Sequence, residues 1–234
     1  MQTKRAAYCA VCVALLIAVQ YALQFIAGVE LVTVLLLCFC YVFGIRYGMI
    51  TATAFSLLRC FLFGFYFNVV LLYLIYYNLF AVVAGALGKR RAPPWVFSLL
   101  LASLAVACLY FALAGIPISM LYVQRVQAML WALFGITAAL FVAHLLLVCF
   151  GREKYGAELA CVTAVAAFMT VCFTLLDDVI TPLVYGYSSG VAAAYFYTSF
   201  LAMLPQTICA AVSVFILFYP LKKLFTAYRR NIKT

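Results

Sequence analysis

The chain has 234 residues, of which 71% are hydrophobic and 9% are charged, and its formal net charge is +10. Soluble globular domains carry about 45–50% apolar and about 25% charged residues, so this composition excludes an ordinary soluble domain and predicts an integral membrane protein. Membrane orientation and the anionic lipid of the inner leaflet explain the positive charge, and we expect no nucleic-acid partner.

Apolar stretches follow one another along the chain, and most are long enough to form a helix across the ~30 Å of membrane hydrocarbon. We therefore predict an all-α, polytopic membrane helix bundle with about eight transmembrane helices. The predicted spans are 6–27, 29–45, 48–66, 69–88, 95–115, 127–150, 159–176 and 193–219. They form a single membrane domain (1–234) made of three parts, which are four helices (1–94), an apparent extra helix pair (95–150), and a last helix pair with a basic tail (151–234).

The positive charges are sorted along the chain. Of the 15 Lys and Arg residues, all but Arg59 and Arg125 fall in every second gap between spans or at the two ends. Segments rich in Lys and Arg stay in the cytoplasm, so we predict a multi-pass plasma-membrane protein with cytoplasmic N- and C-termini. Glu30, Asp177 and Asp178 fall at the opposite ends of their spans, which makes the external face mildly acidic.

The first span carries alanines at intervals of four, at Ala6, Ala10, Ala14, Ala18 and Ala22. Residues four apart on a helix drift by only ~40°, so these alanines form a narrow, smooth stripe that lets another helix approach closely. The stripe predicts either packing against the chain's own helices or the docking of a partner protein.

The third span contains Arg59 in its middle third. An unpaired guanidinium at that depth costs at least ~2.5–3.5 kcal/mol, so Arg59 must face a cavity or a partner. Glu30 and the Asp177–Asp178 pair are candidate counter-ions. The alternative is that Arg59 extends its head group to the interface or fixes helix packing.

Amide side chains and a proline interrupt the apolar pattern in or beside the fourth span and in the last span. Asn68 and Asn78 lie there among tyrosines, and Asn78 needs a hydrogen-bond partner from another helix or a solute. Pro205 and Gln206 are expected to interrupt the last span and free backbone carbonyls. Both features are typical of a cavity, and both also occur in plain helix bundles.

The segment from Asp177 to Gly190 is expected to form an outer loop that leads to Tyr195. Carboxylates among tyrosines are suited to a cationic or hydrogen-bonding ligand, although an interfacial aromatic belt would have the same composition. The candidate substrate-binding residues are Glu30, Arg59, Asn68, Asn78, Asp177, Asp178, Tyr185, Tyr195 and Gln206.

Catalytic and metal signatures are missing from the sequence. The ten cysteines are spread over the spans and the single histidine, His144, is far from the close cysteine pairs, which favours packing roles and no metal site. The chain has no HExxH, GxSxG or GxxxxGK[ST] motif. We therefore expect no enzymatic activity and no cofactor bound by this chain, and uphill transport would need an ion gradient or a separate motor.

Glycine and proline punctuation in the two halves of the chain resembles that of the substrate-binding S components of energy-coupling factor (ECF) vitamin transporters. The resemblance covers about half of the chain and rests on the stretches 28–33, 43–48, 63–65 and 84–88, on Asp177 with the later Tyr185-Gly186, on 204–206 and on Pro220-Leu221.

This resemblance implies a membrane receptor that captures a scarce, vitamin-like solute outside the cell. S components dock on a transmembrane T subunit driven by two ATPase subunits, which use the ATP, and they dock through AxxxA on the first helix. Ala6, Ala10 and Ala14 match that pattern. The family has six helices, so segment 95–150 would be an added pair, and the acidic, tyrosine-lined outer surface favours a cationic or amine-bearing organic vitamin.

Two other classes of function remain open from the residues alone. One is a structural scaffold of the cell envelope that resembles the rod-shape D-type protein, which would bind protein partners and no solute. The other is a self-sufficient secondary carrier or a membrane enzyme, which would act without partner subunits.

Overall fold

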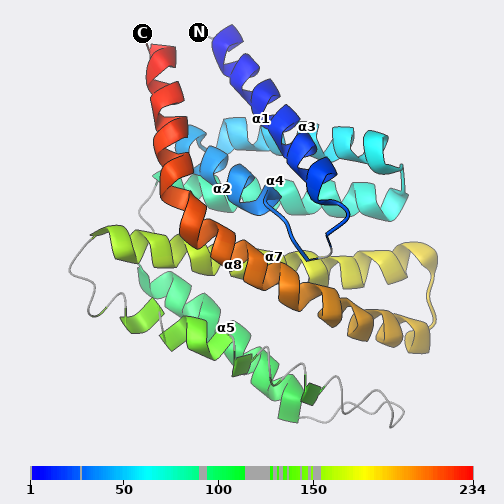
Figure 1. Ribbon diagram of the computed structural model, residues 1–234. Helices are drawn as coiled ribbons and strands as arrows, with labels where there is room; N and C mark the ends of the chain where they lie inside the picture. The colour runs from blue at the N-terminus through cyan, green and yellow to red at the C-terminus, as the bar shows by residue number, and fades with distance from the viewer. Residues whose placement is uncertain are drawn as a thin grey trace.

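The computed structural model describes residues 2–26, 28–89, 94–113 and 154–233, and parts of 127–149. Within these residues every regular element is a helix and none is a strand, which confirms the predicted all-helical architecture (Figure 1). The helices are α1 (Gln2–Leu23), α2 (Val32–Phe43), α3 (Ile45–Phe63), α4 (Phe67–Lys89), α5 (Pro94–Leu113), α7 (Lys154–Tyr185) and α8 (Ser189–Lys233). The predicted span 127–150 lies partly outside the described residues, and Arg90, Arg91, Arg125 and Arg152 lie wholly outside them.

Four helices in the described part of the chain are long and apolar enough to cross a membrane, namely Ala6–Leu23, Phe67–Gly88, Glu158–Tyr185 and Ser189–Arg230. Val32–Phe43 and Thr137–Leu146 are apolar but shorter. α3 is long enough, but Arg46 and Arg59 reduce its hydropathy. These helices are those of a membrane protein, and the finer count of eight crossings remains a prediction.

The prediction of an outer loop beginning at Asp177 is wrong, because α7 continues as a helix to Tyr185. Its end is set by Gly186, which has a φ of 62° and therefore lies in the left-handed region that glycine tolerates. The backbone N–H of Tyr187 donates to the carbonyl of Pro182 at 3.0 Å, the closing bond of a glycine-terminated helix. Asp177 and Asp178 consequently lie on the last turns of a helix.

The predicted interruption of the last span is also wrong, because α8 runs through both Pro205 and Pro220. Each proline removes one bond of the helical ladder, which bends a helix more readily than it ends one when neighbours hold both sides. Figure 1 shows α8 changing direction along its length, so that its last part lies beside the start of α1. A ring contact at 5.7 Å between Tyr8 and Tyr228 joins these two parts.

The main hydrophobic core is formed by α1, α2, α3, α4, α7 and α8. α2 is its centre, since ten of its residues are buried and it contacts all five of the other helices. Close approach of α4 to the α2–α3 junction depends on small residues, because a Cβ at Gly85 would lie 2.6 Å from the backbone nitrogen of Ile45 and one at Gly88 would overlap the Tyr41 carbonyl. Burial of apolar surface on all sides of α2 thus organises the bundle.

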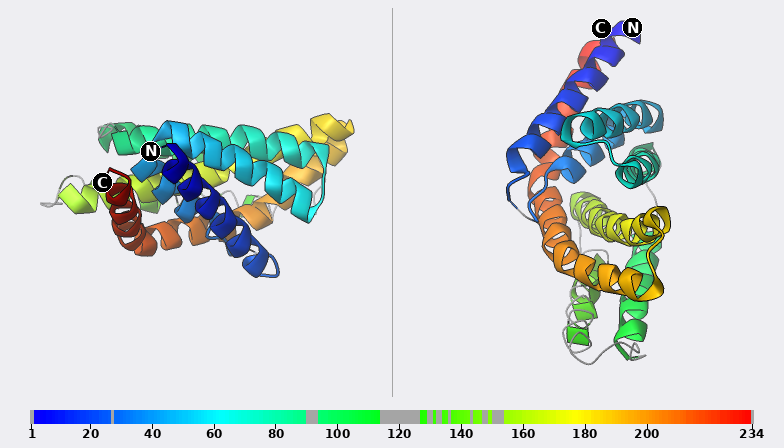
Figure 2. Two further views of the ribbon diagram at one scale, coloured as in Figure 1. Left: turned by 90° about the horizontal axis from the view of Figure 1, so that it is seen from above. Right: turned by 90° about the vertical axis from the view of Figure 1, so that its right-hand side faces the viewer.

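α5 lies outside this core and packs on α7. Cys108 and Ala112 of α5 form a separate small cluster with Val171, Tyr197 and Met203, against which Phe134 also packs. In Figure 1 and in the right-hand view of Figure 2, α5 lies at the edge of the bundle farthest from α1 and α3. The described part of segment 95–150 therefore packs outside the core formed by the other six helices.

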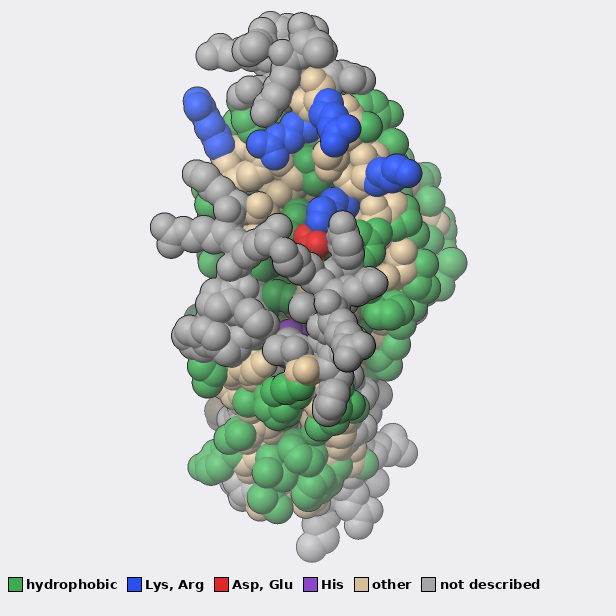
Figure 3. Space-filling model, turned by 90° about the vertical axis from the view of Figure 1, so that its left-hand side faces the viewer, with side chains coloured by type: hydrophobic (Ala, Val, Ile, Leu, Met, Phe, Trp, Pro, Cys, Tyr) green, Lys and Arg blue, Asp and Glu red, His purple; other side chains and the backbone are tan. Residues whose placement is uncertain are grey.

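Positive side chains gather at one end of the bundle, where Figure 3 shows them together with one carboxylate. The described Lys and Arg side chains at this end are Arg46, Lys222, Lys223, Arg229 and Arg230, whereas Arg59 lies near the opposite end of α3. Arg229 donates to the carbonyl of Val42 at 2.6 Å, which brings the end of α8 to the α2–α3 junction that precedes Arg46. The two chain ends lie close together in Figure 1, and Asp177 and Asp178 lie near the opposite end of α7.

Candidate functional site

A cavity of about 410 Å³ lies between the α1–α2 connection and helices α1, α3, α4, α7 and α8. Of the predicted substrate-binding residues, the fold brings Glu30, Arg59 and Gln206 together in its wall, although they are up to 176 positions apart in the chain. The remaining predicted residues are not among those that line it. This volume is within the range of about 300–1,000 Å³ that small-molecule sites occupy.

One wall of the cavity is the connection between α1 and α2, which is fastened to the middle of α8. Gly28 has a φ of 79°, and a Cβ at this position would lie 2.7 Å from Cβ of Pro205. Next to this contact, the backbone N–H of Glu30 donates to Sγ of Cys209 at 3.3 Å, and that thiol donates back to the Glu30 carbonyl at 3.4 Å. The connection therefore has one defined position against α8.

Glu30 presents its carboxyl group to the cavity from this connection. The hydroxyl of Thr33, in the first turn of α2, donates to Oε1 of Glu30 at 2.5 Å. Burial raises the pKa of the Glu30 carboxyl above its ordinary value, and the Thr33 hydrogen bond opposes part of that increase. A positive or hydrogen-donating group that entered the cavity would stabilise the ionised form.

Arg59 enters the cavity from α3 and lies on aromatic rings. Its guanidinium carbon is 4.5 Å from the ring centroid of Tyr73 and 5.5 Å from that of Phe63, which are cation–π distances. Its Nε is buried and has no hydrogen-bond partner. Among the described residues the expected counter-ions make no ion pair with it, since the single pair found there joins Lys222 and Glu158.

Gln20 of α1 completes the polar part of the cavity. Its side-chain nitrogen donates to the hydroxyl of Tyr73 at 3.4 Å, while its Oε1 is buried without a partner. Gln20 and Gln24 both line the cavity but were not predicted. Two amides one helical turn apart in an apolar span could have revealed them, because each needs a partner at that depth.

Aromatic side chains form the rest of the lining. The ring of Tyr77 in α4 contacts those of Tyr73 and Tyr76 in the same helix, with centroids 5.0 Å apart in each pair. Phe173 of α7 packs edge-on against Tyr76 at 4.9 Å. The sequence showed the tyrosines of the fourth span as a group, but nothing in it indicated that Phe173 and Thr170 would face them. The cavity thus offers flat apolar surfaces beside a few polar groups, as solute sites do.

Five of the other predicted residues take part in a second polar group between α4, α7 and α8. Thr181 receives a hydrogen bond from the amide of Asn68 at 3.0 Å and donates to Asp177 at 2.7 Å. Tyr195 donates to the second oxygen of Asp177 at 2.8 Å, and Tyr185 donates to Asn68 at 3.2 Å. Next to them, Ser199 donates to Asp178 at 2.8 Å. Most of these bonds join one helix to another, so we interpret the group as a structural connection of α7 to α4 and α8.

Asn78 also has a structural partner. Its side-chain oxygen accepts a hydrogen bond from Thr53 of α3 at 3.0 Å, and its amide donates to the carbonyl of Leu74 at 2.8 Å. The partner that the sequence required is therefore a neighbouring helix. Asn78 joins α3 to α4, and it is not among the residues that line the cavity.

The predicted docking residues lie on a separate surface. Ala6, Ala10 and Ala14 are exposed on α1, and they line an apolar groove of about 470 Å³ whose other wall is α3. The α3 wall carries Ile50, Ala54, Leu58 and Leu62. On the opposite face of α1, Cys12 and Leu16 are buried in the core. The alanines of this stripe therefore face outward, while larger residues hold α1 in the bundle.

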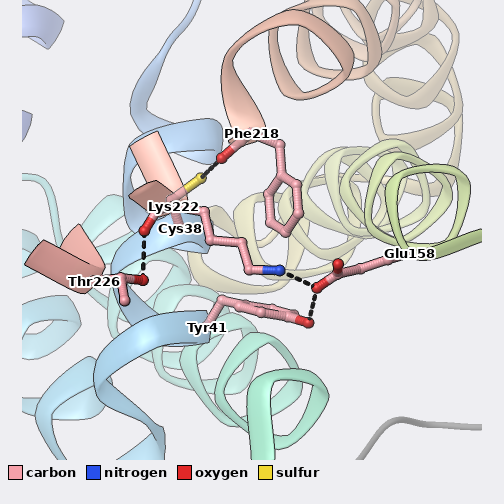
Figure 4. Close-up of polar contacts among 6 residues, drawn as sticks. All are labelled: Cys38, Tyr41, Glu158, Phe218, Lys222 and Thr226. Carbon is pink, nitrogen blue, oxygen red and sulfur yellow. Dashed lines mark hydrogen bonds and ion pairs between the residues drawn. The ribbon is translucent and has the colours of Figure 1, made fainter. Parts of the chain in front are cut away.

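At the positively charged end, Lys222 of α8 forms an ion pair with Glu158 of α7, and Tyr41 of α2 donates to the same carboxylate (Figure 4). The Lys222 ammonium also lies 5.2 Å from the ring centroid of Tyr41. Both charged side chains are partly buried, and the group connects three helices. This is a structural connection away from the cavity.

Among the described residues, no three His, Cys, Asp or Glu side chains lie close enough to hold a metal ion. Comparison with family models, with curated proteins and with solved structures finds no match to this chain. Its function must therefore be argued from the geometry of the cavity and the groove.

Proposed function

We propose that this protein is the substrate-capture subunit of an ECF-type transporter in the plasma membrane. In this role it binds a small, vitamin-like organic solute at its extracellular side. It then docks on a T subunit with two ATPase subunits, whose ATP drives uptake. The chain itself would carry out no catalysis and hold no cofactor.

The observation that carries this proposal is the cavity around Glu30 and Arg59. Two charged side chains, partnerless polar atoms and several aromatic rings converge there on a space large enough for a small molecule. Burying charged groups inside a membrane helix bundle costs free energy, and such groups usually mark a solute or ion pathway. A purely structural scaffold has no need for such a space.

The charge distribution supports an extracellular position for the cavity. Arg59, Gln20 and Tyr73 lie in the parts of α3, α1 and α4 far from the positively charged end, which by the positive-inside rule faces the cytoplasm. With eight crossings both termini would be cytoplasmic, in agreement with their position side by side. A solute would then reach the cavity from outside.

The groove between α1 and α3 supports the docking half of the proposal. Exposed alanines let the backbone of a second helix approach closely, which is how small residues promote helix association in membranes. The groove is separate from the cavity, so the chain could hold a partner and a solute at the same time.

Co-purification from cells that contain T and ATPase subunits tests this function. We expect the full chain to retain those subunits in mild detergent, and Ala10→Trp and Ala14→Trp to lose them. Ala194→Trp, at an exposed position of α8, should retain them. Unchanged complex formation in the α1 variants would count against docking through this helix, and solute uptake by the chain alone in liposomes would favour a self-sufficient carrier.

A further inference from the structure

The charges that line the cavity restrict the solute more than the sequence did. The sequence suggested a cationic solute, on the strength of Asp177 and Asp178, but both carboxylates lie in the second polar group and not in the cavity wall. The cavity instead contains one carboxyl group, Glu30, and one guanidinium group, Arg59.

These two charged groups line the same cavity without pairing. The guanidinium carbon of Arg59 lies 4.5 Å from the ring centroid of Tyr73. No nitrogen of Arg59 lies within ion-pair distance of Glu30. Among the described residues, the single ion pair joins Lys222 and Glu158. A ring contact replaces only part of the hydration that a guanidinium loses on burial. Each charge is thus available to a group of opposite sign.

Two buried polar atoms of the cavity have no hydrogen-bond partner, so a bound solute would need groups that complement them. Nε of Arg59 is a donor and needs an acceptor. Oε1 of Gln20 is an acceptor and needs a donor. Burying a polar atom without a hydrogen bond is costly, so a solute with both kinds of group would remove both costs. A solute with a single positive charge would leave Arg59 uncompensated.

We propose that the solute is an amphoteric small molecule with a flat ring. Its anionic or accepting group pairs with Arg59, its amino or other donating group meets Glu30 and Gln20, and its ring stacks among Tyr73, Tyr76 and Phe173. This inference rests on the proposed function, since it names the class of solute that the same cavity would capture. A solute with one positive and one negative group has no net charge, so its binding adds no net charge to the buried cavity. A singly charged solute would add one.

The test uses the full chain in mild detergent and matched probes on two rings. One set is tryptophan, tryptamine and indole-3-propionate, and the other is phenylalanine, phenethylamine and 3-phenylpropionate. Each set holds the ring fixed and offers both groups, the amine alone or the carboxylate alone. Titration by calorimetry gives the affinity of each probe, and denaturation followed by mass spectrometry in both ion polarities identifies any small molecule that the protein carried.

We expect the amphoteric member to bind best in at least one set, or the released molecule to carry both an acidic and a basic group. Arg59→Gln should weaken amphoteric binding by at least about tenfold and leave the amine probe nearly unchanged. Glu30→Gln should also weaken binding of the amphoteric probe, but it should weaken the amine probe as well and leave the carboxylate probe nearly unchanged. Arg46→Gln, an exposed arginine at the other end of the bundle, is the matched control.

The inference is overturned if the best probe or the released molecule carries a single kind of charged group, or if neither substitution changes binding of an amphoteric compound. In that outcome the protein still captures a solute and the proposed function stands. If no probe binds and no small molecule is released, the inference and the solute-capture function both fail, and the scaffold alternative gains support.

Discussion

Gly28 and Pro205 meet so closely that a single added carbon at Gly28 would lie 2.7 Å from Cβ of Pro205. One residue belongs to the connection that walls the cavity, and the other belongs to the middle of α8. Their contact brings Glu30 to Cys209 and so sets where the Glu30 carboxyl group lies.

Substitution of Gly28 by alanine should displace this connection. Alanine is strained at a φ of 79° and also collides with Pro205, so the wall must move away from α8. We expect solute affinity to fall by about tenfold or more, measured by titration of the solute recovered from wild-type protein. Gly186→Ala is the control, because it has a similar φ of 62° but open space around it. Equal losses in the two variants would show that backbone strain alone, and not the Pro205 contact, is responsible.

Glu30→Gln should stabilise the protein when no solute is added. Burial raises the pKa of Glu30, so ionisation of this group destabilises the folded state at any pH above the ordinary glutamate pKa of about 4.3. Glutamine removes that cost and still accepts the Thr33 hydrogen bond. Melting temperatures should therefore be higher for the variant at pH 7.5, and the difference should shrink toward pH 4. A difference that does not depend on pH would contradict the assignment.

The ion pair between Lys222 and Glu158 should contribute to stability. Lys222→Met leaves the partly buried Glu158 carboxylate with Tyr41 as its remaining described partner, and we expect a loss of about 1–2 kcal/mol, reduced from the fully buried case by solvent exposure. Lys223→Met removes the same charge from an exposed neighbouring position and should change the melting temperature little. If both variants melt alike, the pair has no measurable role.

Asp177→Asn tests whether Asp177 contributes to stability alone or also to solute binding. Asparagine cannot accept from both Thr181 and Tyr195 through two carboxylate oxygens, so a loss of about 1–2 kcal/mol in stability is expected. Solute affinity should be unchanged, because Asp177 is not among the residues that line the cavity. A large loss of solute affinity with normal stability would show that Asp177 is a substrate-binding residue.

The membrane orientation can be measured with an impermeant maleimide in intact cells. Ser188→Cys, in the α7–α8 connection, should react from outside, and Arg46→Cys, at the positively charged end, should react only after the cells are opened. The wild-type chain is the baseline for its own cysteines, most of which are buried. Reaction of both variants from the same side would contradict the predicted topology.

The helical fold could be predicted from composition and from the lengths of the apolar stretches, because burial in lipid requires closed backbone hydrogen bonding. The end of α7 could not, since the residues from Asp177 to Tyr185 contain carboxylates and Pro182, which read as a loop. Pro182 removes one backbone hydrogen bond of α7, that to the carbonyl of Asp178, and the helix still continues to Tyr185.

The candidate site was predicted in part. Arg59 drew attention as a charge within an apolar span, and Glu30 as an acidic residue at the outer end of one; this reasoning is local to each residue. Which polar residues face one cavity depends on helix rotation, which sequence position alone does not determine. Asn68 and Asp177 therefore looked like binding residues, whereas both hydrogen-bond to Thr181 of α7, and Tyr195 of α8 also donates to Asp177.

The peripheral position of α5 has a mechanical consequence. The helices α1 and α3, which form the walls of the groove, lie on the side of the bundle away from α5 (Figure 2), and α5 packs on α7. In the proposed complex, a partner seated in that groove would contact α1 and α3 and leave α5 outside the interface. Changes in the sequence or length of α5 should therefore leave the proposed docking unaffected.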